Sequence, residues 1–303
     1  TLLERRRSAL EHHDALRTAL MWEPRGPADM YGCVLVPPHT EDADFGILFL
    51  HNEGYSTMCG HGIIAIATVA LEAGILPAEE PETTLRIDTP AGPITARARV
   101  ESGRVTSVAF TNVPSFVLHA DREVQVPGLG SVRGDVAFGG AFYVFVDAAQ
   151  VGVTLGPESF QQLINKGMAI KRALMAEGGI THPFEDDLSF LYGTIFTGVP
   201  MSDGADSRNV CVFAEGEVDR SPTGTGVSAR AAIHRARGEL EVGQTMVVES
   251  IIGSRFAVRV LEDTKFGPYP AVIPEVEGSA SITGRHEFLI DADDPLCNGF
   301  ILR

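Results

Sequence analysis

The sequence contains an internal repeat, in which two segments match at an offset of 164 residues. The first copy runs from Cys59 to Leu76 and the second from Thr223 to Leu240. The identical pairs are Gly60/Gly224, Gly62/Gly226, Ala65/Ala229, Ala67/Ala231, Gly74/Gly238 and Leu76/Leu240, with Phe49/Phe213 and Glu53/Glu217 upstream. Because so many identities share one register, the repeat predicts two duplicated domains.

In each copy an apolar strand leads into a glycine-rich turn, and an alanine-rich helix follows. Gly60 and Gly62, like Gly224 and Gly226, carry no side chain to cover the first N–H groups of that helix. Unpaired N–H groups and the helix dipole both favour negative charge, so each helix start is a candidate anion site. We expect each helix to be buried in the middle of its domain, with both starts facing one cleft that holds a small carboxylate.

Short strands predominate along the rest of the chain. The pattern predicts two further helices, over residues 1–20 and 158–176, and places the helix of the second copy over residues 225–237. It predicts strands over 32–36, 45–50, 84–110 (as a meander), 190–197, 209–214, 245–261 and 285–290. This order lacks a repeating βα unit, so the predicted fold class is α+β. The predicted domains are residues 1–114 with 285–303, which carry Cys59, and residues 115–284, which carry Thr223.

The chain is acidic, with 24 Lys and Arg residues against 40 Asp and Glu residues and a formal net charge of −16. A surface that binds nucleic acid or an anionic membrane needs a local surplus of basic side chains, so neither is an expected partner. The longest apolar stretch, Gly62 to Leu71, is shorter than the about 20 residues of a membrane span. Because the chain opens at Thr1 and not at Met, we expect an N-terminal segment to precede it.

The four cysteines are widely spaced and form no CxxC pair or zinc-like set. The nine histidines include no HExxH or HxxxH pair, and no motif for an organic cofactor is present. The sequence therefore predicts no metal and no cofactor. Few, dispersed thiols in an acidic chain indicate a reduced, cytoplasmic protein. Cys33, Cys211 and Cys297 lie in strand-like or terminal contexts and are predicted to be structural.

Cys59 is the strongest candidate for a reactive group. It precedes the free N–H groups of a predicted helix, and a helix start stabilises a thiolate. Most cysteines are small buried hydrophobes, but the Met-Cys-Gly-His-Gly segment is too polar and glycine-rich for a core. His61 is either a helix-capping core residue or a partner of a polar ligand. Asp219 is either an ordinary loop aspartate or an acid that binds an ammonium group.

Met58–Gly62 and Asp219–Gly226 resemble the paired active-site motifs of the proline racemase family, which has a diaminopimelate-epimerase-like fold. The resemblance extends over essentially the whole chain, including Arg285–Phe288 and Asp291–Gly299. It implies two pseudo-symmetric domains, each a β-barrel-like sheet around a central helix, with the active site in the cleft between them. Racemases and 4-hydroxyproline epimerases of this family use two cysteines, one from each domain, on opposite faces of the substrate α-carbon.

The sequence departs from the racemase pattern at the second cysteine, where it has Thr223. This Cys/Thr pair resembles the trans-3-hydroxy-L-proline dehydratase branch of the family. The resemblance implies that Cys59 is the catalytic base, that Thr223 occupies the second catalytic position, and that Asp219 binds the amine. The positions that bind the substrate carboxylate and amine correspond to Gly60, His61, Gly224 and Thr225.

The implied reaction is the dehydration of trans-3-hydroxy-L-proline to Δ1-pyrroline-2-carboxylate, without metal or cofactor. A threonine hydroxyl is too weak an acid to exchange roles with the Cys59 thiol, so a carbanion formed there would instead expel its 3-hydroxyl as water. Alternatives are a proline racemase or 4-hydroxyproline 2-epimerase and, from another class, a non-catalytic imino-acid-binding protein. The sequence is compatible with a homodimer but fixes neither the oligomeric state nor side activities on proline and 4-hydroxyproline.

Overall fold

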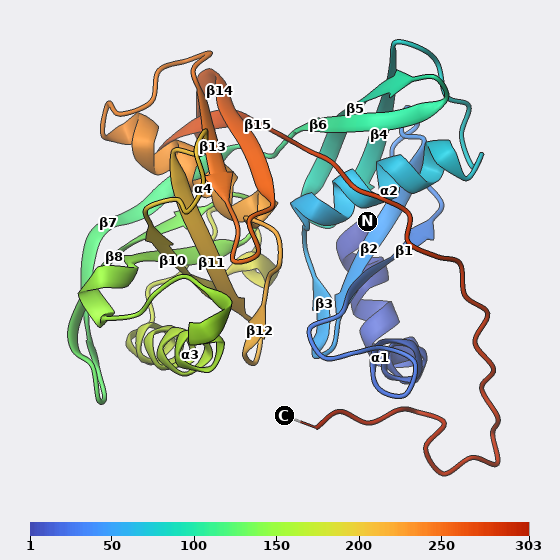
Figure 1. Cartoon of the computed structure of the whole chain (residues 1–303), viewed down its shortest axis with the longest axis horizontal. Coiled ribbons are helices and arrows are strands. Elements are labelled where there is room, and N and C mark those ends of the chain that lie inside the picture. Colours follow the sequence, from blue (N-terminus) through green and yellow to red (C-terminus); the bar gives the residue numbers. More distant parts are fainter. Residues whose placement is uncertain (303) are drawn as a thin grey trace. The chain divides into compact units, whose positions relative to one another are not determined.

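The computed structural model describes residues 1–302 and divides the chain into two compact units (Figure 1). Unit 1 comprises Thr1–Val108 and Ser279–Arg303, and unit 2 comprises Ala109–Gly278. Four α-helices and 15 strands lie within the described residues, which confirms the α+β class. The division into domains 1–114 with 285–303 and 115–284 stays a prediction, because compactness alone does not show that a unit folds independently.

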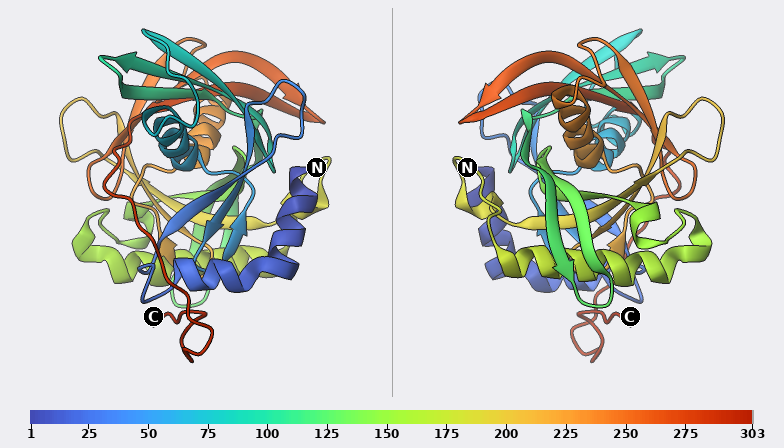
Figure 2. Two further views of the ribbon diagram at one scale, coloured as in Figure 1. Left: turned by 90° about the vertical axis from the view of Figure 1, so that its right-hand side faces the viewer. Right: turned by 90° about the vertical axis from the view of Figure 1, so that its left-hand side faces the viewer.

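Unit 1 contains a sheet in the order β1-β2-β4-β5-β6, and β3 pairs with β2. Helix α1 begins with a capping box, in which the Thr1 hydroxyl accepts the N–H of Glu4, and it packs along β2 and β3 (Figure 2). Helix α2 packs against β1 and β5. The elements are α1 (Leu2–Met21), β1 (Tyr31–Val36), β2 (Phe45–His51), β3 (Gly54–Ser56), α2 (Gly60–Glu72), β4 (Glu82–Thr89), β5 (Gly92–Glu101) and β6 (Arg104–Thr111).

In unit 2 eight strands form a closed barrel in the order β7-β8-β9-β10-β11-β13-β14-β15, and β12 pairs with β11. Pairing of Ser115 and Phe116 on β7 with Val272 and Ala271 on β15 closes the barrel. The strands are β7 (Ser115–Val126), β8 (Gly130–Phe138), β9 (Phe142–Asp147), β10 (Leu191–Gly198), β11 (Ser207–Phe213), β12 (Glu217–Val218), β13 (Thr245–Glu249), β14 (Arg255–Phe266) and β15 (Tyr269–Gly278). Closure leaves a barrel without free sheet edges, so its interior can enclose a helix.

That enclosed helix is α4 (Gly224–Ala236), whose first ten residues are all buried and which contacts β7, β8, β14 and β15 (Figure 2). The amphipathic helix α3 (Phe160–Glu177) instead covers the outside of β7, β10 and β11. Helices α2 and α4 have 13 residues each and begin 164 residues apart, at the offset of the sequence repeat. The predicted buried central helix is therefore confirmed for α4, whereas α2 is buried along most of its length but leaves Ala65 exposed.

The strand predicted over residues 285–290 is wrong. These residues form no helix or strand, and all of them are exposed. Their apolar side chains cover no sheet, because the segment pairs with no strand and is held by one ring contact within it and by hydrogen bonds from a distant arginine. The ring of His286 stacks on Phe288 with 5.9 Å between centroids, and the carbonyl of Leu289 accepts hydrogen bonds from the Arg25 guanidinium at 3.2 and 3.3 Å.

Candidate active site

Cys59 is the N-cap residue of α2, as the sequence predicts for its position. Its backbone is extended, and its Sγ accepts a hydrogen bond from the N–H of Gly62 at 3.3 Å. The residue is only 5% exposed. The sulfur thus lies against the first N–H groups of α2 and near the positive end of the helix dipole, both of which stabilise a thiolate. This geometry suits a nucleophile or a base.

The third residue of each central helix is a glycine that makes room for the cap side chain. A Cβ on Gly62 would lie 3.2 Å from the Cys59 Sγ and 2.9 Å from the Phe49 ring. A Cβ on Gly226 would lie 3.2 Å from the Thr223 Cβ. All three separations are tighter than real side chains normally show, so each glycine permits the observed direction of its cap residue.

His61, the second residue of α2, is half-buried next to Cys59. The edge of the Tyr31 ring meets the His61 ring with 5.1 Å between centroids and an interplanar angle of 75°. Tyr31 is itself held by stacking on His51 and by a hydrogen bond to Ser56. Aromatic packing therefore orients the His61 ring, which lies two residues after the candidate thiol in the sequence.

Thr223 is the N-cap residue of α4, the counterpart of Cys59, but its backbone differs. Its φ is +69°, a left-handed conformation that a β-branched residue rarely adopts and that costs about 1–3 kcal/mol. Its side chain does not cap the helix. Instead the hydroxyl donates to Oδ2 of Asp219 at 3.0 Å. Such strain is typical of functional positions.

Asp219 organises the turn that precedes α4. Its Oδ1 accepts the N–H of Ser221 at 2.7 Å, while its Oδ2 accepts the Thr223 hydroxyl. The Ser221 hydroxyl in turn accepts the N–H of Thr223 at 3.0 Å. The side chain of Asp219 is buried. These bonds place a carboxylate directly beside the second helix start, where an ammonium group of a ligand would find an opposite charge.

Thr225 is buried at the second position of α4, next to Gly224. Its hydroxyl forms a hydrogen bond of 2.7 Å with the phenol of Tyr143, which comes from β9. Burial raises the pKa of Tyr143 well above its ordinary value, so the phenol stays protonated. The start of α4 therefore presents backbone N–H groups together with a hydroxyl.

Two further thiols lie close to these groups. Burial raises the pKa of Cys33 on β1 to about 12, and the neighbouring Cys59 adds to the rise. Burial also raises the pKa of Cys211 on β11 well above its ordinary value, with a contribution from the charge of Asp219. Both thiols are thus held in the neutral form, which supports their predicted structural role.

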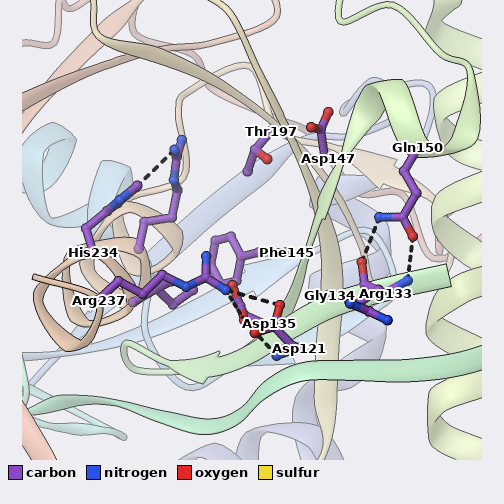
Figure 3. A pocket seen from close by; sticks show the side chains of 12 residues that line it. Asp121, Arg133, Gly134, Asp135, Phe145, Asp147, Gln150, Thr197, His234 and Arg237 are labelled. Atoms are coloured by element: carbon purple, nitrogen blue, oxygen red, sulfur yellow. Dashed lines mark hydrogen bonds and ion pairs between the residues drawn. The ribbon is translucent and has the colours of Figure 1, made fainter. Parts of the chain in front are cut away.

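Two cavities of unit 2 lie away from the residues predicted to form the site. The cavity in Figure 3, of about 320 Å³, contains Arg237, which points to Asp135 at 2.8 Å and to Asp121 at 3.5 Å. The second, of about 680 Å³, shares Arg230 with it. None of the predicted site residues lines either cavity.

The structure brings Cys59, Gly60 and His61 together in unit 1, and Asp219, Thr223, Gly224 and Thr225 together in unit 2. Sequence reasoning did not include Tyr143, because no motif surrounds it. The repeat itself marks Gly62 and Gly226 but does not reveal their contact with the cap residues.

Within residues 1–302, no set of three His, Cys, Asp or Glu side chains is arranged to hold a metal, and no helix has the length and apolar character for crossing a membrane.

Comparison with known proteins places these motifs in context. Trans-3-hydroxy-L-proline dehydratase of Colwellia psychrerythraea is 46% identical over 303 residues, which cover 100% of this chain and 85% of the relative. A protein of Burkholderia multivorans named 3-hydroxyproline 2-epimerase is also 46% identical over 303 residues, covering 100% of this chain and 90% of the relative.

Among solved structures, a hydroxyproline epimerase from Agrobacterium vitis with bound trans-4-hydroxy-L-proline matches with a TM-score of 0.94 and 34% identity. The match covers 100% of this chain and 87% of that chain, and it confirms the expected fold. A family model described as proline racemase matches residues 1–301. The chain therefore belongs to the proline racemase family.

Proposed function

We propose that the chain is a hydro-lyase that converts trans-3-hydroxy-L-proline to Δ1-pyrroline-2-carboxylate. Several relatives at 46% identity, from Colwellia and other bacteria, carry the name of this dehydratase. The observation that carries the proposal is that the N-cap residue is a thiol, Cys59, at the start of α2 and a hydroxyl, Thr223, at the equivalent start of α4. One half-site thus has a base that works near neutral pH, and the other does not.

In this proposal a small imino acid binds between the two helix starts. Its carboxylate accepts hydrogen bonds from the N–H groups of Gly60, His61, Gly224 and Thr225, and the dipoles of α2 and α4 add to the attraction. Its ammonium group lies next to the buried carboxylate of Asp219. In the proposal the contacts with Gly60 and His61 orient the α-carbon relative to the Cys59 sulfur, which lies on the same helix start.

The chemical step begins when the Cys59 thiolate removes the α-proton. In trans-3-hydroxy-L-proline the α-hydrogen and the 3-hydroxyl lie on the same face of the ring. The electron pair of the broken Cα–H bond forms the Cα=C3 double bond, and the C3–O bond breaks. The Cys59 thiol returns its proton to the departing oxygen, which leaves as water and restores the thiolate. The enamine then tautomerises to Δ1-pyrroline-2-carboxylate.

A direct assay tests the proposal. The protein is incubated separately with trans-3-hydroxy-L-proline, trans-4-hydroxy-L-proline and L-proline, and pyrroline carboxylate is measured. We expect product only from the 3-hydroxy compound. Absence of product from that substrate, in a protein that binds it, would instead support a non-catalytic imino-acid-binding protein.

A second candidate, epimerisation at the α-carbon, is favoured by the name of the Burkholderia multivorans relative. An epimerase must deliver a proton to the face opposite Cys59. The resemblance assigns that face to Thr223, whose hydroxyl donates to Asp219, and burial raises the pKa of Cys211 in the same unit. Recovery of inverted, α-deuterated substrate from D2O would establish epimerisation.

A cytoplasmic location and a homodimeric assembly remain predictions. The cysteines at positions 33, 59, 211 and 297 are all free, which fits a reducing compartment. Light scattering of the purified protein would give its oligomeric state.

A further inference from the structure

Tyr143, on β9, contacts the start of α4 from the barrel interior. Its side chain is 1% exposed, and its hydroxyl is 2.7 Å from Oγ1 of Thr225. Within residues 1–302 neither hydroxyl has another hydrogen-bond partner. Each group has one proton to donate, so one of the two must donate and the other must accept.

The direction of this bond depends on which of the two protons is left without a partner. If Thr225 donated, the phenol proton of Tyr143 would remain unpaired in the barrel interior, at a cost of about 1–3 kcal/mol. If Tyr143 donates, the proton left over belongs to Thr225, which is also buried but lies at the start of α4, where a bound carboxylate could accept it. Burial keeps the phenol protonated because it raises the pKa of Tyr143 well above its ordinary value. Either hydroxyl can donate in the protein alone, but with a carboxylate at the start of α4 both protons are paired only when Tyr143 donates to Thr225.

The position of Tyr143 relative to α4 is fixed by the backbone. A Cβ on Gly139, in the turn that leads into β9, would lie 2.2 Å from the carbonyl oxygen of Thr225 and 2.7 Å from the nitrogen of Ala229. The Asn112 amide joins the same two elements, because it donates to the carbonyl of Gly139 at 2.7 Å and to the hydroxyl of Ser228 at 2.8 Å. This close packing leaves the phenol little freedom to move away from Thr225.

We infer that Tyr143 is a positioning residue, which occupies the acceptor side of the Thr225 hydroxyl and so directs the Thr225 proton toward the ligand carboxylate. The inference rests on the proposed function of the α4 start as a carboxylate site. Tyr143 is buried behind Thr225, so we do not expect it to touch the substrate. Its effect should therefore appear in substrate binding and pass entirely through Thr225.

A double-mutant cycle tests this inference. We would measure kcat and KM for trans-3-hydroxy-L-proline, the affinity for pyrrole-2-carboxylate by calorimetry, and the melting temperature. The variants are Tyr143→Phe, Thr225→Val and their combination, with Tyr192→Phe as a matched control in a buried tyrosine of β10. Thr225→Ser serves as the conservative variant, because it retains the hydroxyl.

For Tyr143→Phe we expect a KM about tenfold higher, a kcat within about threefold of wild type, and a melting temperature within a few degrees. In the Thr225→Val background Tyr143→Phe should change KM by less than about twofold, whereas in the Thr225→Ser background its full effect should return. Tyr192→Phe should leave KM within about twofold of wild type.

Two results would overturn the inference. One is an unchanged KM in Tyr143→Phe. The other is a KM in the double variant that equals the product of the two single changes, which would show that Tyr143 and Thr225 act independently. If Tyr143→Phe fails to fold, the Thr225→Ser and Thr225→Val pair decides, since equal affinities would show that the hydroxyl has no role. If the wild type does not dehydrate the substrate, the proposed function fails separately, and calorimetry with pyrrole-2-carboxylate still reports on the role of Tyr143.

Discussion

The hydroxyl of Thr223 donates to Asp219 at 3.0 Å, whereas the sulfur of Cys59, its counterpart in the repeat, accepts the N–H of Gly62 at 3.3 Å. The two cap residues thus have hydrogen-bond partners of opposite kinds. The N–H of Gly62 is a donor to the Cys59 sulfur, whereas the Asp219 carboxylate is an acceptor for the proton of the Thr223 hydroxyl. The duplicated fold therefore holds two chemically different groups at equivalent places, and we propose that only Cys59 acts as a base.

The first prediction concerns Asp219. Asp219→Asn keeps the size of the side chain but removes the charge that is proposed to attract the substrate amine. We expect kcat/KM to fall about 10- to 100-fold, because hydrogen bonds to charged groups contribute about 1.5–3 kcal/mol. Asp203→Asn, in an exposed loop of unit 2, is the control for the change in net charge. Equal losses in the two variants would show that Asp219 has no specific role.

The second prediction concerns Cys59. Cys59→Ser should retain the fold and lose activity by about 100- to 10,000-fold, since a hydroxyl cannot replace the thiolate as a base near neutral pH. Cys297→Ala should retain most of the rate. Iodoacetamide should inactivate the wild type, and pyrrole-2-carboxylate should protect it. Substantial turnover by Cys59→Ser would contradict the mechanism.

The third prediction concerns Gly62. In Gly62→Ala the new methyl group would lie 3.2 Å from the Cys59 Sγ and 2.9 Å from the Phe49 ring, so the thiol must shift. We expect kcat to fall by less than the about 100-fold that a displacement of about 1 Å can cost, because the sulfur must move only a few tenths of an ångström. The fold should survive, because alanine favours a helix more than glycine does. Ala65→Ser, on the exposed side of α2, is the control. A normal kcat in Gly62→Ala would show that the thiol position is not critical.

Helix positions followed closely from the sequence, whereas long-range contacts did not. The helix predicted over 225–237 forms over Gly224–Ala236, because the glycine-rich start and the alanine pattern are local signals. The helix predicted over 158–176 begins two residues later, since Pro157–Ser159 forms a 3₁₀ turn.

The contact of Tyr143 with Thr225 spans 82 residues and arises only when the barrel closes around α4. The sequence also does not indicate the left-handed backbone of Thr223, because a positive φ is normally signalled by glycine and this position is threonine.

The fourth prediction is a pH dependence of stability from His182. This buried ring lies between Phe138 and Phe266, at centroid distances of 4.9 and 5.4 Å, and its Nδ1 accepts the N–H of Glu185 at 3.0 Å. Burial lowers the pKa of His182 from 6.5 to about 4. Between these two values the unfolded chain binds a proton that the folded chain does not bind. The free energy of unfolding should therefore decrease as the pH falls from about 6.5 to about 4, by at most about 3 kcal/mol from this group.

His182→Asn keeps an acceptor for the Glu185 N–H and removes the titration. Urea unfolding at pH 7 and pH 4.5 should show a smaller pH effect in His182→Asn than in wild type. His13→Asn, on the exposed face of α1, should behave like wild type. An identical pH effect in wild type and His182→Asn would assign the dependence to other groups.

The last prediction concerns Thr223, the position at which this chain departs from the two-cysteine pattern. Thr223→Cys places a thiol on the second helix start and removes the hydroxyl that donates to Asp219. If the missing thiol commits the enzyme to dehydration, the variant should gain weak epimerisation of trans-4-hydroxy-L-proline or racemisation of proline, while dehydration persists. The gained rate should stay well below the dehydration rate, because a small misplacement of a catalytic group costs about 100-fold. The measurement is deuterium incorporation and optical rotation in D2O for the wild type, Thr223→Cys and, as a control that retains the hydroxyl, Thr223→Ser. Efficient proline racemisation by the wild type would show that Thr223 is no barrier to proton delivery, and the choice of dehydration over epimerisation would then be wrong.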